Sequence, residues 1–141
     1  MTRRQLRDSI FKALFRIEFN EKQERQEQLE FHLQELTQQE PEGVINAESS
    51  DLEYVRNKVL DIFAHLEEID EAIASQTEGW TLQRIGKAEL AILRLAVYEM
   101  KYDDEVPQGV AINEAVELTK TYCDEDAKGF VNAVLGKLAK S

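Results

Sequence analysis

Several residue types and patterns that support common functions are scarce in this chain of 141 residues. It contains one cysteine, two prolines and two histidines. The single cysteine, Cys123, excludes an internal disulfide and a metal cluster built from cysteines. The longest apolar run is interrupted by Arg94 and Glu99 and falls short of the ~18 residues of a membrane span. No signal-peptide stretch opens the chain. We therefore expect one domain covering residues 1–141, cytoplasmic and without a membrane partner.

Groups suited to catalysis or metal binding are equally sparse. His32 and His65 fall on separate predicted helices, and we expect both at the surface. Gly79, Gly86 and Gly109 are isolated and form no phosphate-binding loop. The carboxylates are spread along the chain without the spacing of metal ligands. Catalysis needs groups that converge in a pocket, so we expect no enzymatic activity, no cofactor and no metal.

Positive charge is scarce except at the N-terminus. The formal net charge is -11, yet residues 1–17 carry five basic residues against Asp8 alone. This segment therefore has a net charge of +4 and the remainder one of -15. A basic patch on an acidic body can hold a phosphate backbone locally, because salt screens charges beyond about 8 Å. An equally weighted alternative is that these cations only solvate one face of a helix.

The spacing of apolar residues predicts an all-α protein of about seven helices. A first helix is expected over Arg3–Phe19 and a second around Leu29, Leu33 and Leu36, followed by a loop over Gln38–Ser49. Ser50 and Glu53 have the spacing of a capping box, which predicts the start of a long third helix. Its apolar stripe runs from Leu52 to Ile73, and Trp80, in the short turn that follows, is interpreted as a core anchor.

The C-terminal half is the more apolar part. A central helix from Ala88 to Tyr102 has few polar positions, as is typical of a helix enclosed by its neighbours. Arg94 within it predicts a carboxylate partner, which the sequence does not identify. The next helix starts with Pro107 in its first turn, and the last helix is preceded by Asp124 as N-cap. In the helix that starts with Pro107, the residues expected to face inward are Val110, Ala111, Ala115, Leu118 and Tyr122.

Aromatic residues recur every four positions in the first helix. Phe11, Phe15 and Phe19 lie among Arg4, Arg7, Lys12 and Arg16. Rings interleaved with cations suit unstacked RNA bases and their phosphates. We nevertheless expect at least two of the three phenylalanines to pack in the core.

Three C-terminal motifs carry a family resemblance. The order AILRLAVYEM, then VP followed by VAINEAVEL, then FVNAVL resembles the NusB family of bacterial transcription antitermination factors. The same fold serves as an N-terminal RNA-binding domain in some ribosomal RNA cytosine methyltransferases. A length of 141 residues favours the antitermination factors.

The resemblance implies a fold, a function and a set of partners. The fold would be two packed helical subdomains around a central apolar helix, forming one NusB-like RNA-binding domain over residues 1–141. The function would be to bind the boxA element of ribosomal RNA leader transcripts together with ribosomal protein NusE, and to bring RNA polymerase into an antitermination complex. For RNA, the resemblance and the basic patch together single out Arg3, Arg4, Arg7, Lys12, Phe15, Asp126 and Phe130. For the partner, they single out Phe15 and Glu89.

Other interpretations of these residues remain open at this point. Phe130 lies on an apolar stripe and is as compatible with burial as with exposure. Asp126 could only stabilise the first turn of its helix, and Glu89 could pair with a neighbouring cation. Ala133 and Gly129 stand where the family commonly has glycine and a basic residue, so we expect weak RNA binding without the partner. The competing function is a protein-interaction or homodimerisation module with little RNA affinity.

Overall fold

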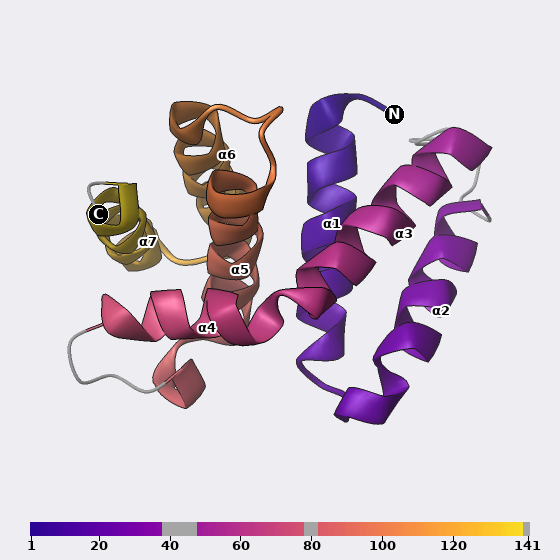
Figure 1. Cartoon of the computed structure of the whole chain (residues 1–141), viewed down its shortest axis with the longest axis horizontal. Coiled ribbons are helices and arrows are strands. Elements are labelled where there is room, and N and C mark those ends of the chain that lie inside the picture. Colours follow the sequence, from indigo (N-terminus) through magenta and orange to yellow (C-terminus); the bar gives the residue numbers. More distant parts are fainter. Residues whose placement is uncertain (38–47, 78–81, 140–141) are drawn as a thin grey trace. The chain divides into compact units, whose positions relative to one another are not determined.

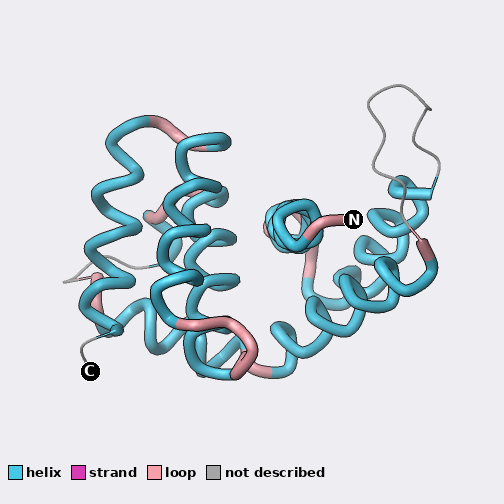
Figure 2. The backbone as a smooth tube through the Cα atoms, turned by 90° about the horizontal axis from the view of Figure 1, so that it is seen from above, coloured by secondary structure: helices cyan, strands magenta, loops and turns pink. Residues whose placement is uncertain are grey.

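The regular elements of the structure, a computed structural model that describes residues 1–37, 48–77 and 82–139, are all helical (Figures 1 and 2). The described residues form seven α-helices: α1 (Arg3–Ile17), α2 (Arg25–Thr37), α3 (Ser49–Ala64), α4 (Leu66–Ser75), α5 (Lys87–Tyr102), α6 (Gln108–Tyr122) and α7 (Glu125–Ala139). Two short 3-10 helices, η1 (Lys22–Glu24) and η2 (Leu82–Arg84), lie between them. The all-α prediction is confirmed. Trp80 and most of the predicted loop lie outside the described residues.

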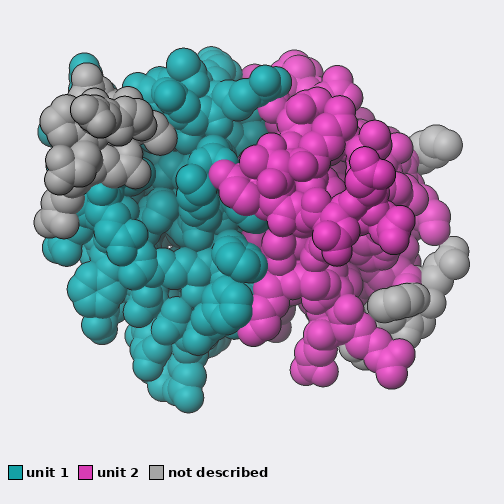
Figure 3. Space-filling view, turned by 180° about the vertical axis from the view of Figure 1, so that it is seen from behind, with its two compact units in different colours: residues 1–63 teal, residues 64–141 magenta. Residues whose placement is uncertain are grey.

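The chain divides into two compact units, residues 1–63 and 64–141, which Figure 3 shows in separate colours. The first contains α1, α2 and nearly all of α3, and the second contains α4 to α7. This division agrees with the expectation of two helical subdomains.

In the first unit, α1 buries one side and contacts α2. Its N-terminus has a capping box, in which the Thr2 hydroxyl accepts from the Gln5 amide and the Gln5 side chain accepts from the Thr2 amide. The buried residues of α1 are Ser9, Ile10, Phe11, Ala13, Leu14 and Ile17. Arg16 joins α1 to α2 through Gln28 at 2.8 Å and Glu35 at 3.1 Å.

His32 is buried, so its predicted surface position is wrong. Its Nε2 lies 2.9 Å from the Ser9 hydroxyl, and the pair lies at a polar cavity of about 330 Å³ between α1 and α2. Burial disfavours the imidazolium and lowers the pKa of His32. A histidine on an apolar stripe was compatible with burial, and the hydroxyl on α1 supplies the hydrogen bond that burial requires.

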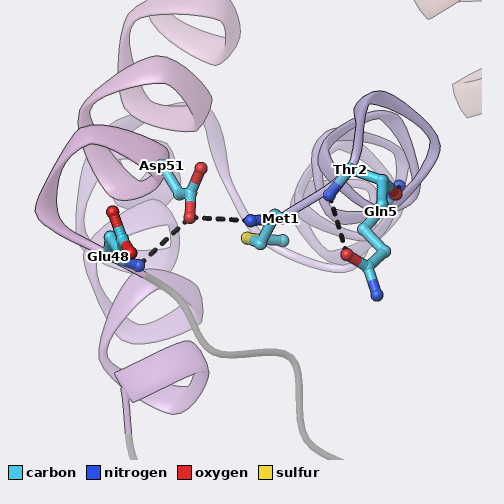
Figure 4. A network of polar contacts seen from close by, with 5 residues as sticks. All are labelled: Met1, Thr2, Gln5, Glu48 and Asp51. Carbon is cyan, nitrogen blue, oxygen red and sulfur yellow. Dashed lines mark hydrogen bonds and ion pairs between the residues drawn. The ribbon is translucent and has the colours of Figure 1, made fainter.

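The start of α3 differs from the predicted capping box at Ser50. With Ser50 as N-cap the helix would begin at Asp51, but it begins two residues earlier, at Ser49, and the Asp51 carboxylate accepts from the Glu48 amide at 3.1 Å. The same carboxylate oxygen lies 3.1 Å from the amino group of Met1 (Figure 4). Both contacts stabilise the carboxylate and lower the pKa of Asp51, the amide more than the amino group. Asp51 is therefore the capping side chain, because two donors meet it.

The predicted long third helix is two helices, α3 and α4. The backbone leaves helical geometry at His65, which has φ -106° and ψ 9°. Apolar spacing did not show this break, because Ile62 in α3 is followed at helical spacing by Leu66 and Ile69 in α4, and all three are buried. The spacing of apolar residues shows which side of a helix is buried. It does not show a break of one residue between two helices when the spacing continues across it.

In the second unit, α5 contacts α4, α6 and α7. The ten consecutive residues from Leu90 to Glu99 are all buried, which confirms the enclosed central helix. The carboxylate expected beside Arg94 belongs to Asp70 of α4, with nitrogen–oxygen distances of 2.9 and 3.0 Å. Burial lowers the pKa of Arg94 to about 10, since the charged form loses water there.

The buried side of α6 differs partly from the prediction. Val110 and Tyr122 are exposed, at 43% and 38%. Ala111 and Ala115 are buried as predicted, and Thr119 is buried as well, at a spacing of four residues. The Thr119 hydroxyl donates to the Ala115 carbonyl at 2.8 Å, so this polar residue is satisfied within the core. Pro107 is the N-cap of α6 and lies just outside the helix.

Candidate functional site

The N-terminus of α1 carries a cluster of arginines, which we call the arginine cluster (Arg3, Arg4 and Arg7). Arg3 and Arg4 are exposed and Arg7 is half-buried. The first turn contains no acidic residue. Cations at a helix N-terminus oppose the helix dipole and are unfavourable by a few tenths of a kcal/mol each. The arginine cluster therefore does not serve helix stability, and its charge suits an anionic ligand.

Lys12 and Phe15 lie further along α1. Lys12 is exposed and pairs with Asp8 at 3.0 Å. The Phe15 ring is half-buried; it stacks on Phe11 at 6.0 Å between centroids and meets Phe19 edge-on at 5.1 Å. Phe11 is 2% exposed and Phe19 is 62% exposed.

The expectation that at least two of these phenylalanines pack in the core is therefore wrong. Only Phe11 among them is buried. The helix ends at Ile17, two residues before the predicted end, so Phe19 lies beyond the last turn. The three rings form a graded row in which exposure rises toward the C-terminal end of α1. Phe15 and Phe19 offer the part of this row that a ligand can reach.

Three predicted residues from distant parts of the sequence meet in the second unit. Glu89 of α5 and both Asp126 and Phe130 of α7 line one cavity of about 550 Å³, which we call the α5–α7 cavity. Arg84 and Lys137 also line it. The cavity thus combines an aromatic ring, carboxylates and cations. Such a mixture can stack a planar group, accept hydrogen bonds from it and hold an adjacent phosphate.

Sequence reasoning missed Arg84 and Lys137. Lys137 lies seven residues after Phe130 and eleven after Asp126, which places all three on one face of α7. That spacing was a usable signal. Arg84 lies in η2, next to residues 78–81 that the structure does not describe, and its position depends on tertiary folding rather than on a local pattern.

Glu89 also interacts with the thiol of Cys123, the C-cap of α6. Burial, the charge of Glu89 and a hydrogen bond to that carboxylate raise the pKa of Cys123 to about 12. The thiol stays protonated near neutral pH, so it is a weak nucleophile. Within the described residues, no three side chains of His, Cys, Asp or Glu are grouped to hold a metal ion.

None of the described helices combines the length and the apolar character needed to cross a bilayer.

Comparison with known proteins identifies the family. Residues 4–140 match the model of the NusB family. The chain belongs to the NusB family. The transcription antitermination protein NusB of Agathobacter rectalis is 43% identical over 139 residues, covering 99% of this chain and 100% of the relative. The protein of that name from Acetivibrio thermocellus is 41% identical over 140 residues, covering 99% and 90%.

Solved structures of the NusB family match the fold. The T. maritima NusB structure aligns with a TM-score of 0.86 at 33% identity, covering 100% of this chain and 92% of that one. A structure of the antitermination factors NusB and NusE in complex with double-stranded RNA aligns with a TM-score of 0.79 at 29% identity, covering 99% and 98%. The resemblance carried by the C-terminal motifs is therefore confirmed.

Proposed function

We propose that this chain is a transcription antitermination factor of the NusB type. It binds boxA-type single-stranded RNA of ribosomal RNA leader transcripts together with ribosomal protein NusE, and joins the RNA polymerase antitermination complex in the cytoplasm. It acts by binding rather than by catalysis, and residues 1–141 serve as one RNA-binding domain. Support comes from family membership and from the solved relative that contains NusE and RNA.

The arginine cluster is the observation that carries the RNA-binding part of the proposal. Arg3, Arg4 and Arg7 place positive charge at the N-terminal end of α1, where the helix dipole adds further positive potential. The remainder of the chain is strongly acidic, so RNA phosphates are attracted most strongly to this end of α1. In this proposal the arginine cluster contacts phosphates, and Lys12 adds a further cation.

The α5–α7 cavity supplies base contacts in the second unit. Phe130 is half-buried and presents a ring on which a base can stack, a contact worth about 1–3 kcal/mol per base in other proteins. Asp126 is exposed at the start of α7 and accepts hydrogen bonds from exocyclic amino groups. Arg84 and Lys137 lie close enough to the cavity to contact phosphate. None of these roles requires deep burial of the RNA.

NusE contacts a different set of residues in this proposal. Phe15 and the more exposed Phe19 offer apolar area on α1, and aromatic anchors dominate many protein interfaces. Glu89 offers a carboxylate at the start of α5. Because Gly129 and Ala133 reduce charge and alter contact on α7, tight RNA binding depends on NusE.

The test measures complex lifetimes with purified components. We expect the complex of this protein with NusE and boxA RNA to dissociate more slowly than either binary complex. A scrambled RNA of the same length and a double-stranded boxA RNA serve as controls. Equal RNA affinity with and without NusE would contradict the partner dependence, and equal affinity for scrambled RNA would contradict the boxA function.

Exposed aromatic area favours one alternative, a homodimer formed through α1 with little RNA affinity. Phe19 is 62% exposed beside Phe15, and such area can serve as a contact between copies. Sedimentation of wild type and Phe19→Ser distinguishes the two functions. The alternative requires a dimer that Phe19→Ser dissociates and no preference for boxA RNA; the proposed function requires that preference whatever the oligomeric state.

A further inference from the structure

The Glu89 side chain folds back over the N-cap of its own helix. Gly86 is that N-cap, and Glu89 is the third residue of α5. A Cβ atom added at Gly86 would collide with Oε2 of Glu89, and the three heavy atoms nearest to it all belong to the Glu89 carboxyl group. The missing side chain at position 86 therefore leaves the space that the carboxylate occupies.

The backbone does not require glycine at this position. Gly86 has φ -55° and ψ 144°, a conformation that any residue adopts. Neither a left-handed turn nor strain explains the glycine. The side chain that an added methyl group would meet first is that of Glu89.

Cys123 contacts the same carboxylate from another helix. It is the half-buried C-cap of α6, 34 residues away in sequence from Glu89. After burial, the charge of the nearby Glu89 carboxylate and a hydrogen bond to it are the causes that raise the pKa of the Cys123 thiol. The carboxylate is thus bounded by Gly86 on its own helix and by Cys123 on α6, while Glu89 and Gly86 line the α5–α7 cavity.

We propose that Gly86 and Cys123 are positioning residues that fix the orientation of the Glu89 carboxylate beside the α5–α7 cavity, and thereby strengthen the binding of NusE. The effect on NusE binding rests on the proposed contact between Glu89 and NusE. A carboxylate that is already oriented loses less conformational freedom when it accepts a hydrogen bond from a guanidinium or amide group of a partner. Gly86 and Cys123 themselves need not touch NusE.

The first experiment tests the orientation without any partner. Cys123 is alkylated with iodoacetamide at several pH values between 8 and 10 in wild type, Gly86→Ala and Glu89→Gln. Glu89→Gln removes the negative charge beside the thiol and Gly86→Ala displaces it, so both variants should alkylate about threefold faster or more at a given pH. Gly109→Ala is the matched control, because a Cβ there meets nothing within 4 Å. An unchanged rate in Gly86→Ala would overturn the proposal.

The second experiment measures NusE affinity by calorimetry in the same variants and in their double mutant. We expect Gly86→Ala to weaken binding about fivefold, the effect of one lost hydrogen bond. It should have no further effect in the Glu89→Gln background, since the two residues act as one unit. Cys123→Ser, which keeps a donor, should bind more tightly than Cys123→Ala. Additive effects of Gly86→Ala and Glu89→Gln would overturn the positioning role.

The two experiments separate this proposal from the proposed function. If Gly86→Ala accelerates alkylation but Glu89→Gln leaves NusE affinity unchanged, Glu89 is oriented as proposed but does not contact NusE, and the effect on binding is overturned. If NusE does not bind at all, the proposed function fails, and the alkylation rates still decide whether Gly86 and Cys123 orient Glu89. Circular dichroism of each variant checks that its helices are retained.

Discussion

Helices α1 and α5 are of nearly equal length and differ in what their charges do. α5 is enclosed by its neighbours, and its one buried arginine, Arg94, is paired with Asp70. α1 buries one side only, and Arg3 and Arg4 remain exposed at its N-terminus. The sequence that identifies the NusB family lies largely in α5 and the helices after it, and most of it is core. In the proposed function, the residues that contact RNA phosphates lie mainly in α1, so the segment that identifies the family is not the main RNA-binding segment.

The strongest test of the difference between enclosed and exposed charge removes one buried, paired arginine and one partly exposed, paired arginine. Arg94→Ala should destabilise the protein by about 3–5 kcal/mol, because it removes the guanidinium that faces the Asp70 carboxylate at a largely buried site. Urea unfolding followed by circular dichroism measures this free energy.

Arg56→Ala is the matched control for that measurement. Arg56 also makes a two-pronged contact with a carboxylate, Glu30, at 2.8 and 3.0 Å, but both side chains are at least one-third exposed. Exposed pairs contribute at most about 1 kcal/mol. If the two variants lost equal stability, the distinction between enclosed and exposed charge would fail.

The phenylalanine row sharpens the comparison within α1. Phe11→Ala should lower the free energy of unfolding by about 3 kcal/mol, since its ring is fully enclosed. Phe19→Ala should change it by less than about 0.5 kcal/mol, as is usual for exposed positions, and should weaken NusE binding. A large stability loss in Phe19→Ala would show that its ring belongs to the core, contrary to its exposure here.

The pH dependence of stability tests the polar contact between α1 and α2. The pKa of His32 is lowered by burial and by Arg16 and Lys12, and Glu35 opposes this shift. The unfolded chain then binds the proton more readily, so this contribution to stability is present above the unfolded pKa of about 6.5 and is lost as the pH falls below it. Unfolding free energies at pH 7.5, 6.5 and 5.5 should fall more steeply for wild type than for His32→Gln. The extra slope is bounded by about 1.4 kcal/mol per pH unit, the limit for one proton, and equal slopes would contradict the buried neutral histidine.

Periodicity predicted the helices well because each buries a continuous apolar stripe. It failed where a single residue ends a helix or changes which side chain is buried. His65 separates α3 from α4 without interrupting the apolar spacing, and Thr119 is buried because its hydroxyl bonds to the preceding turn. Neither effect has a signature in the order of apolar and polar residues. Asp51 rather than Ser50 is the capping side chain, because its carboxylate accepts from the Glu48 amide and from the Met1 amino group, which is distant in sequence.

The candidate site was predictable in part. The charge imbalance of residues 1–17 indicated the arginine cluster directly. The resemblance supplied Glu89, Asp126 and Phe130, and the structure brings these three to one cavity. The roles of Gly86 and Cys123 could not be predicted, because they depend on a carboxylate that folds back over its own helix and on a contact between α5 and α6.

The salt dependence of RNA binding tests the central claim most directly, that α1 binds RNA and α5 serves as scaffold. Wild type, an Arg3, Arg4 and Arg7 to Ala variant, and a control with Lys101, Lys120 and Lys128 changed to Ala are titrated with boxA RNA at several salt concentrations. Each single-strand phosphate contact contributes about 0.7 to the slope of log affinity against log salt. The arginine variant should therefore bind more weakly, with a slope shallower by about 2 units, at unchanged unfolding free energy. Wild-type affinity and slope in the arginine variant, or an equal loss in the lysine control, would contradict the account.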